Sequence, residues 1–129
     1  MKKLMSLFLS ALMLTGCAGA GKQTNTYRRI SMDEAVTMME QEIGYIILDV
    51  RQPDEYAAGH IPNAINVANE SIGTSEIAEL PDKNQLILVY CRSGRRSKEA
   101  AEKLVKLGYT NIVEFGGIID WKGETVAGE

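Results

Sequence analysis

The sequence has 129 residues, a hydrophobic content of 45% and a formal net charge of -3. This length and composition suit one globular domain with a buried core and a short targeting segment. The acidic balance, without a long basic run, argues against nucleic-acid binding. One histidine and two cysteines provide too few ligands for a structural zinc site, so no metal is expected.

Residues 1–27 have the pattern of an export signal followed by a tether. Lys2 and Lys3 precede an apolar run over 4–14 that is too short to span a bilayer. The segment Leu14-Thr15-Gly16-Cys17 resembles the lipobox of bacterial lipoproteins, in which cleavage precedes a lipid-bearing cysteine. The resemblance implies a signal peptide over 1–16, lipid on Cys17 and a flexible tether over 17–27. The domain over 28–129 would then lie outside the cytoplasm, anchored to a bacterial envelope membrane; an ordinary secreted protein is the alternative.

The first half of the domain alternates helical and strand patterns. Ser31 and Glu34 form a capping box for a helix that is expected to end near Gly44. Residues 45–50 are a nearly continuous apolar run, which is typical of a strand buried on both faces. Pro53 suits the first turn of a short helix, and a turn over 59–63, a short strand over 64–67 and a helix over 70–80 are expected to follow. The apolar face of the first helix is assigned to Met32, Ala35, Val36, Met39 and Ile43.

The second half repeats this alternation. Residues 86–90 form a second buried strand, and a loop follows from Cys91 to Arg96. Ser97 is expected to cap the next helix, which ends at Gly108. A last short strand over 111–115 and a short helix around Trp121 complete the chain. Alternating strands and helices predict a single α/β domain with a mainly parallel central sheet flanked by helices.

The loop that begins at Cys91 is the strongest candidate for chemistry. It follows a buried strand and precedes a helix, which is where open α/β sheets bind ligands. Gly94 lets the backbone curl, so that loop N–H groups can converge on an anion, and the three arginines at 92, 95 and 96 add positive charge. This environment favours a thiolate over a thiol, which makes Cys91 a candidate nucleophile. A buried, inert cysteine is the alternative.

Four segments carry a resemblance to a known family. Cys91-Arg92-Ser93-Gly94-Arg95-Arg96-Ser97 resembles the active loop Cys-x-x-Gly-x-Arg-Ser/Thr of single-domain rhodaneses. Asp49-Val50-Arg51, the segment from Gly59 to Asn66, and Gly116-Gly117 with Trp121 resemble other rhodanese segments, in family order over residues 28–123. Asn63 replaces the usual glycine, and asparagine tolerates a positive φ better than most residues.

The resemblance implies a rhodanese-like fold and a double-displacement transfer of sulfur; we expect a monomer, although the sequence leaves the oligomeric state open. Cys91 would take sulfane sulfur from a small anionic donor such as thiosulfate and pass it, from a persulfide, to cyanide or a thiol. No metal or organic cofactor is implied. Arg92 and Arg95 are expected to face the substrate more than Arg96 does. The full set assigned to substrate binding is Arg92, Ser93, Gly94, Arg95, Arg96, Ser97 and Arg51.

Two residues and the function of the protein have competing interpretations. Arg51 is also a candidate for a structural ion pair with Glu55, which is the favoured interpretation, and His60 is interpreted as a packed turn residue more than as a base. A phosphatase or arsenate reductase of the related fold would need a Cys-x5-Arg loop, whereas Ser97 is the sixth residue after Cys91. A non-catalytic binding module is the other alternative, although inactive members of such families typically lose the cysteine.

Overall fold

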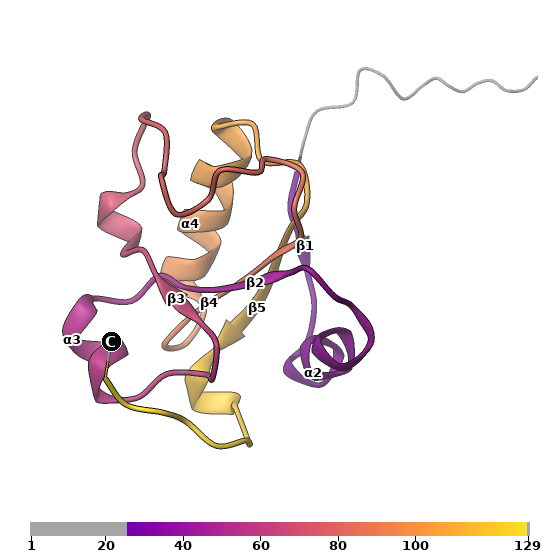
Figure 1. Cartoon of the computed structure of the whole chain (residues 1–129), viewed down its shortest axis with the longest axis vertical. Coiled ribbons are helices and arrows are strands. Elements are labelled where there is room, and N and C mark those ends of the chain that lie inside the picture. Colours follow the sequence, from indigo (N-terminus) through magenta and orange to yellow (C-terminus); the bar gives the residue numbers. More distant parts are fainter. Residues whose placement is uncertain (1–25, 129) are drawn as a thin grey trace, which may run out of the picture.

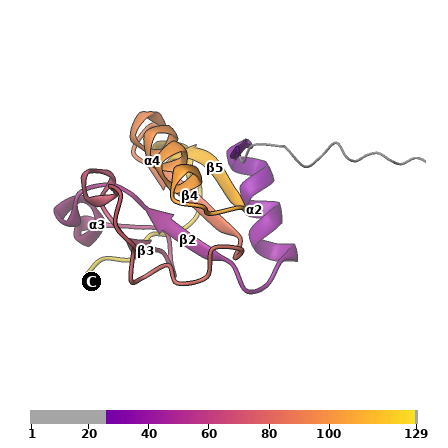
Figure 2. The same ribbon diagram turned by 90° about the horizontal axis from the view of Figure 1, so that it is seen from above.

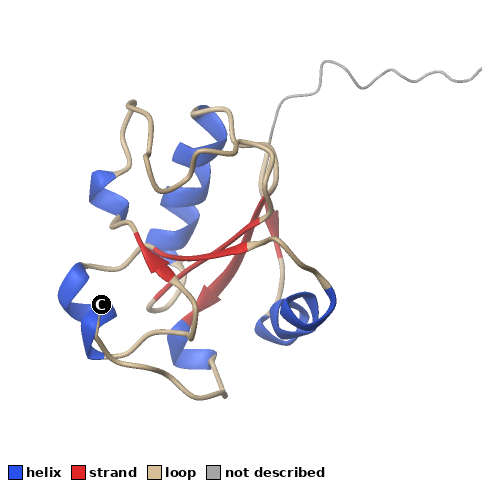
Figure 3. Ribbon diagram, in the orientation of Figure 1, coloured by secondary structure: helices blue, strands red, loops and turns tan. Residues whose placement is uncertain are grey.

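The two apolar runs form the middle of a five-stranded parallel sheet. The computed structural model describes residues 26–128, so the expected signal peptide, Cys17 and most of the tether lie outside the described residues. The strand order is β1-β5-β4-β2-β3, with β4 between β5 and β2, and every pairing is parallel (Figures 1 and 3). The strands are β1 (Arg28–Arg29), β2 (Ile46–Asp49), β3 (Ile65–Asn66), β4 (Ile87–Cys91) and β5 (Ile112–Gly117).

Helices cover both faces of the sheet, as the apolar character of β2 and β4 requires. The helix α4 (Arg95–Lys106) covers one face and α2 (Met32–Gln41) covers the other (Figures 1 and 2). Neighbouring residues of a strand point to opposite faces, so Val89 and Cys91 pack on the α4 side while Leu88 and Tyr90 pack on the α2 side. The predicted α/β class with a parallel sheet is confirmed.

The predicted capping box of α2 is confirmed, but its end is not where the sequence placed it. Ser31 Oγ accepts a hydrogen bond from the Glu34 N–H at 3.1 Å, and Glu34 Oε1 accepts one from the Ser31 N–H at 2.8 Å. The helix ends at Gln41, before it reaches Ile43. The assignment of Ile43 to the apolar face is therefore wrong, and its side chain is 92% exposed.

The helix expected over 70–80 is also wrong. Only a 3-10 turn, η2 (Asn69–Ser71), forms there, and the chain continues as irregular structure to β4. Gly73 weakens helix formation in this segment. Ile72, Ile77 and Leu80 are each buried against the α4-side core without a helix to align them. Tertiary packing satisfies these apolar residues one at a time, which hydrophobic periodicity alone does not reveal.

The remaining elements agree with the sequence more closely. The helix α3 (Pro53–Ala58) begins at the predicted proline, and Asn63 has a φ of +74° in the turn before β3. A 3-10 turn, η3 (Ile118–Asp120), precedes Trp121. The C-terminal segment returns to α3, where the backbones of His60 and Val126 exchange two hydrogen bonds. Within residues 26–128, no helix is both long and apolar enough to cross a membrane.

Candidate active site

Cys91 is the last residue of β4, at the carboxyl edge of the sheet, and α4 begins four residues later. Its Sγ accepts a hydrogen bond from the Gly94 N–H at 3.0 Å and lies 3.5 Å from Ser97 Oγ. Gly94 has a φ of +117°, a conformation that glycine adopts without steric cost, and this curl turns its N–H back to the sulfur. The residue is only 1% exposed, so the loop encloses the thiol rather than presenting it on the surface.

The start of α4 differs from the sequence prediction. The helix begins at Arg95 with Gly94 as its N-cap, so Ser97 lies in the first turn and is not the cap. Its hydroxyl is therefore free to turn toward the sheet, where Ser97 is fully buried. The first-turn N–H groups of α4 have no partner within the helix, and they surround the same end of β4 as the sulfur.

The loop is held in place by the turn after β5. A Cβ atom at Gly117 would overlap the Arg92 carbonyl group and the Ser93 nitrogen, so only glycine allows this approach. The Arg92 carbonyl also accepts a hydrogen bond from the Ile119 N–H at 3.2 Å. The Gly116-Gly117 pair thus has a physical role: it lets the β5 backbone support the loop that carries Cys91.

A shift of register in β5 brings a carboxylate to the site. Val89 pairs with Glu114 and Cys91 pairs with Gly117, so two steps along β4 correspond to three along β5. Gly116, with a φ of +94°, lies within this irregularity. Such bulges re-aim side chains near active sites. Here the Gly116 N–H donates a hydrogen bond to Glu114 Oε2 at 2.9 Å, and the same oxygen lies 2.5 Å from Ser97 Oγ.

Glu114 was not among the residues that the sequence singled out. It is 1% exposed, and its second oxygen, Oε1, accepts a hydrogen bond from Arg29 Nε at 3.1 Å. The available signal was a single acidic residue within an otherwise apolar strand. A buried carboxylate requires several hydrogen-bond donors, which places polar partners around it. The partners themselves come from β1 and α4, far away in the sequence, and only the fold identifies them.

The three loop arginines have different surroundings. Arg92 and Arg95 are exposed, and the Arg95 guanidinium forms an ion pair with Glu99 at 3.2 Å. Arg96 is largely buried and forms two hydrogen bonds with Glu55, the shorter being 2.7 Å. Arg92 and Arg95 are therefore more open to solvent than Arg96.

The Arg96–Glu55 pair attaches α4 to α3. The hydrogen bond from Arg96 lowers the pKa of Glu55 from 4.5 to about 2, although burial acts in the opposite direction. The same contact raises the pKa of Arg96. The expected ion pair between Arg51 and Glu55 is wrong, because Glu55 already binds Arg96.

Arg51 belongs to a buried network beneath the site. Its guanidinium donates hydrogen bonds to the Asp49 carboxylate, the shortest of them 2.7 Å, and to the Gly59 carbonyl at 2.7 Å. Tyr90 donates to the same carboxylate at 2.6 Å, and burial together with this bond raises the pKa of Tyr90. Only 7% of the Arg51 side chain is exposed. The geometry therefore fits the structural interpretation of Arg51, with Asp49 as its partner.

His60 has the surroundings of a packed turn residue. Its ring stacks on Tyr56 with centroids 3.7 Å apart, and Nδ1 lies 2.8 Å from the Tyr56 carbonyl oxygen. These contacts occupy the ring at the turn and do not involve Cys91. Among residues 26–128, no group of three or more His, Cys, Asp or Glu side chains could hold a metal ion.

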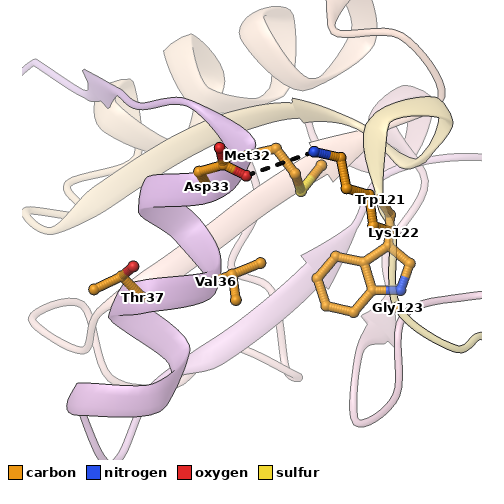
Figure 4. Close-up of a pocket in the computed structure, with 7 residues that line it drawn as sticks. All are labelled: Met32, Asp33, Val36, Thr37, Trp121, Lys122 and Gly123. Carbon is orange, nitrogen blue, oxygen red and sulfur yellow. Dashed lines mark ion pairs between the residues drawn. The ribbon is translucent and has the colours of Figure 1, made fainter.

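A separate pocket of about 500 Å³ lies between α2 and the segment after η3 (Figure 4). Met32 and Trp121 line it, and Lys122 Nζ lies 4.0 Å from Asp33 Oδ1 across its rim. None of its lining residues belongs to the Cys91 loop. The arrangement at Cys91 is instead a cradle around one sulfur atom, with the Gly94 N–H and the Ser97 hydroxyl within 3.5 Å of Sγ.

Comparison with known proteins places this cradle in a family. The rhodanese-like domain family matches residues 31–124. The thiosulfate sulfurtransferase PspE of Escherichia coli is 38% identical over 73 residues, which are 57% of this chain and 70% of that protein. The thiosulfate sulfurtransferase GlpE of Pseudomonas entomophila is 34% identical over 107 residues, which are 79% of this chain and 94% of that protein.

Solved structures agree. A rhodanese with anions from E. coli superposes with a TM-score of 0.59 at 38% identity, covering 65% of this chain and 99% of that one. A rhodanese-like domain protein from Staphylococcus aureus gives a TM-score of 0.68 at 28% identity, covering 79% and 99% of the two chains. The family match spans most of the described residues and includes the cysteine loop, α4 and the glycine pair that supports the loop. This chain belongs to the rhodanese-like domain family, and its relatives support a rhodanese-type sulfurtransferase.

Proposed function

We propose that this protein transfers sulfane sulfur from thiosulfate, or a similar small anionic donor, to a thiol or cyanide through a persulfide on Cys91. The observation that carries this proposal is that the Sγ of Cys91 accepts a hydrogen bond from the Gly94 N–H at 3.0 Å, at the start of a 12-residue helix. Backbone N–H groups and the helix N-terminus favour negative charge at this point. The naming of relatives as thiosulfate sulfurtransferases supports the choice of donor.

The reaction has two displacements. The Cys91 thiolate attacks the outer sulfur of thiosulfate, a new S–S bond forms, and the bond to the inner sulfur breaks as sulfite leaves with the electron pair. The acceptor then attacks the outer sulfur of the persulfide, and the Cys91 thiolate is restored. Splitting the transfer in this way replaces one difficult step with two easier ones. No step requires a metal or an organic cofactor.

The residues around Cys91 have distinct roles in this proposal. The N–H groups from Gly94 into the first turn of α4 hold the anionic sulfur. Arg92 and Arg95 draw the dianionic donor to the loop, acting through their field because they are exposed. Arg96 attaches α4 to α3 through its ion pair with Glu55, and its role in the proposal is to hold the loop in place.

The loop fits sulfur transfer better than phosphoryl or arsenate chemistry. A phosphatase of the related fold would place an arginine at the sixth residue after the cysteine, where it bonds a tetrahedral oxyanion. Here that residue is Ser97, and its Oγ lies 2.5 Å from the Glu114 carboxylate. A serine hydroxyl committed to a carboxylate cannot supply the guanidinium that would bind a tetrahedral oxyanion at that position.

We also propose that lipid on Cys17 anchors the domain to a bacterial envelope membrane, on its extracytoplasmic side. The support is the sequence Leu14-Thr15-Gly16-Cys17 at the end of the apolar run. Two or more acyl chains give a stable anchor, since each buried methylene contributes about 0.8 kcal/mol. A thiol-based sulfur acceptor in that compartment would have to be a small or protein thiol kept reduced.

Intact-mass and peptide mass spectrometry after incubation with thiosulfate tests the catalytic proposal. One added sulfur atom is expected on Cys91, and it should disappear when cyanide or a thiol is added. The Cys91→Ser variant should gain no sulfur and turn over no thiosulfate. A wild-type protein that remains unmodified on Cys91 would instead support a binding module that keeps the fold without the reaction.

A further inference from the structure

Glu114 is a buried carboxylate for which the proposed sulfur transfer has no use. Its two oxygens accept from three elements: Arg29 Nε on β1 at 3.1 Å, Ser97 Oγ on α4 at 2.5 Å, and the Gly116 N–H in β5 at 2.9 Å. Three donors, one of them a guanidinium, are the partners that a buried carboxylate anion requires. A negative charge therefore lies one hydroxyl group away from the sulfur of Cys91.

The direction of the Ser97 hydrogen bond follows from counting protons. The hydroxyl has a single proton, and three acceptors surround it: Glu114 Oε2 at 2.5 Å, the Gly94 carbonyl at 3.0 Å and the Gly116 carbonyl at 3.3 Å. The carboxylate oxygen of Glu114 is both the closest and the strongest acceptor, so it accepts the hydrogen bond that the Ser97 hydroxyl donates. Ser97 then turns only lone pairs toward Cys91, whose thiol can donate to them across 3.5 Å.

We propose that Glu114 is a positioning residue that acts on Cys91 through Ser97 and restrains ionisation of the thiol, an inference that rests on Cys91 being the nucleophile of the proposed function. Glu114 orients the Ser97 hydroxyl as an acceptor, which stabilises S–H. It also adds a negative charge that opposes a thiolate. The Gly94 N–H and the start of α4 act in the opposite direction, so reactivity at Cys91 reflects a balance of the two.

The other charged groups near Cys91 do not replace this effect. Arg29 offsets part of the Glu114 charge, but its side chain is 60% exposed and its contribution is screened. Arg96 has 17% of its side chain exposed, and Glu55 on α3 holds its guanidinium. Arg92 and Arg95 are exposed. The pair of Asp49, the last residue of β2, with Arg51 is internally neutral.

Alkylation of the full-length protein by iodoacetamide, a neutral reagent, provides the test. The rate at the Cys91 peptide would be measured by mass spectrometry from about pH 5 to about pH 10, a range that spans ordinary thiol ionisation. Glu114→Gln should lower the midpoint of the rate profile by about one pH unit, because a full charge is removed at close range. Ser97→Ala should also lower the midpoint, since the thiol loses its acceptor. In the Ser97→Ala background, Glu114→Gln should have a smaller effect than it has alone.

Two matched variants control for general effects. Glu102→Gln makes the same substitution on the exposed side of α4 and should leave the midpoint unchanged. Arg29→Gln keeps the hydrogen bond between Ser97 and Glu114 but removes the positive charge that offsets the Glu114 carboxylate, so the midpoint should rise slightly. A midpoint that stays in place or rises in Glu114→Gln overturns the proposal. A purely structural role for Glu114 would change the melting temperature or the plateau rate and leave the midpoint where it was.

Ser97→Ala decides the matter if Glu114→Gln does not fold. A raised midpoint in Ser97→Ala would show that the hydroxyl donates to the thiolate, which contradicts the proposed orientation. Iodoacetamide requires no sulfur donor, so this test is independent of turnover. A midpoint shift as expected, in a protein that gains no sulfur from thiosulfate, would refute the proposed function while leaving the hydrogen-bond arrangement intact.

Discussion

Gly117→Ala tests whether the backbone of β5 supports the catalytic loop. The added methyl group would overlap the Arg92 carbonyl and the Ser93 nitrogen, both of which are backbone atoms that cannot rotate away. Overpacking of this kind costs about 1–3 kcal/mol. The domain has roughly 100 residues, where 1 kcal/mol shifts the melting temperature by about 4–8 °C, so a loss of about 4–24 °C is expected.

The loss of activity should exceed the loss of stability. Relief of the clash requires the Arg92 carbonyl to move away from the Ile119 N–H, and the loop shifts with respect to Cys91. A displacement of about 1 Å in a catalytic group can cost about 100-fold in rate. Thiosulfate turnover and thermal melting would be measured beside Gly73→Ala, where an added Cβ has no neighbour within 4 Å. If Gly117→Ala keeps the wild-type melting temperature and kcat/KM, the close approach does not position the loop.

Replacing Arg92 and Arg95 together with alanine should lower kcat/KM for thiosulfate by about 2- to 30-fold at low salt, because each exposed charge contributes about 0.2–1 kcal/mol. The loss should shrink at high ionic strength, and an unchanged kcat/KM at low salt would show that backbone N–H groups alone attract the donor. Glu55→Gln should reduce the free energy of unfolding at neutral pH by about 1–3 kcal/mol through loss of a charge-assisted bond. Folding lowers the pKa of Glu55 from 4.5 to about 2. In urea titrations, the difference in the free energy of unfolding between wild type and Glu55→Gln should therefore be fully present above pH 4.5 and should disappear as the pH falls through about 2. A difference that stays constant with pH would contradict the ion pair. Cys17→Ser should abolish incorporation of labelled fatty acid and release the protein from membranes, and a variant that still carries label would exclude Cys17 as the lipid site.

Local patterns determined much of the architecture. The apolar runs that became β2 and β4 are buried on both faces, as is typical of strands in a parallel sheet between helices. The capping box at Ser31 and the proline at residue 53 marked helix starts correctly, because both act through neighbouring backbone groups. The helix expected over 70–80 failed because its apolar residues are buried by partners in other elements.

The sequence by itself determined the α/β class and the position of Cys91 between a buried strand and a helix. These features depend on residues close together in the chain. Only the tertiary structure decided which charges meet: Glu55 with Arg96, Asp49 with Arg51, and Glu114 with Ser97 and Arg29. The last set involves a register shift between β4 and β5, and Glu114 reaches Ser97, the residue beside the Cys91 sulfur. Register depends on the buried faces of both strands and on their connection, which here runs through α4, so neither strand reveals it alone.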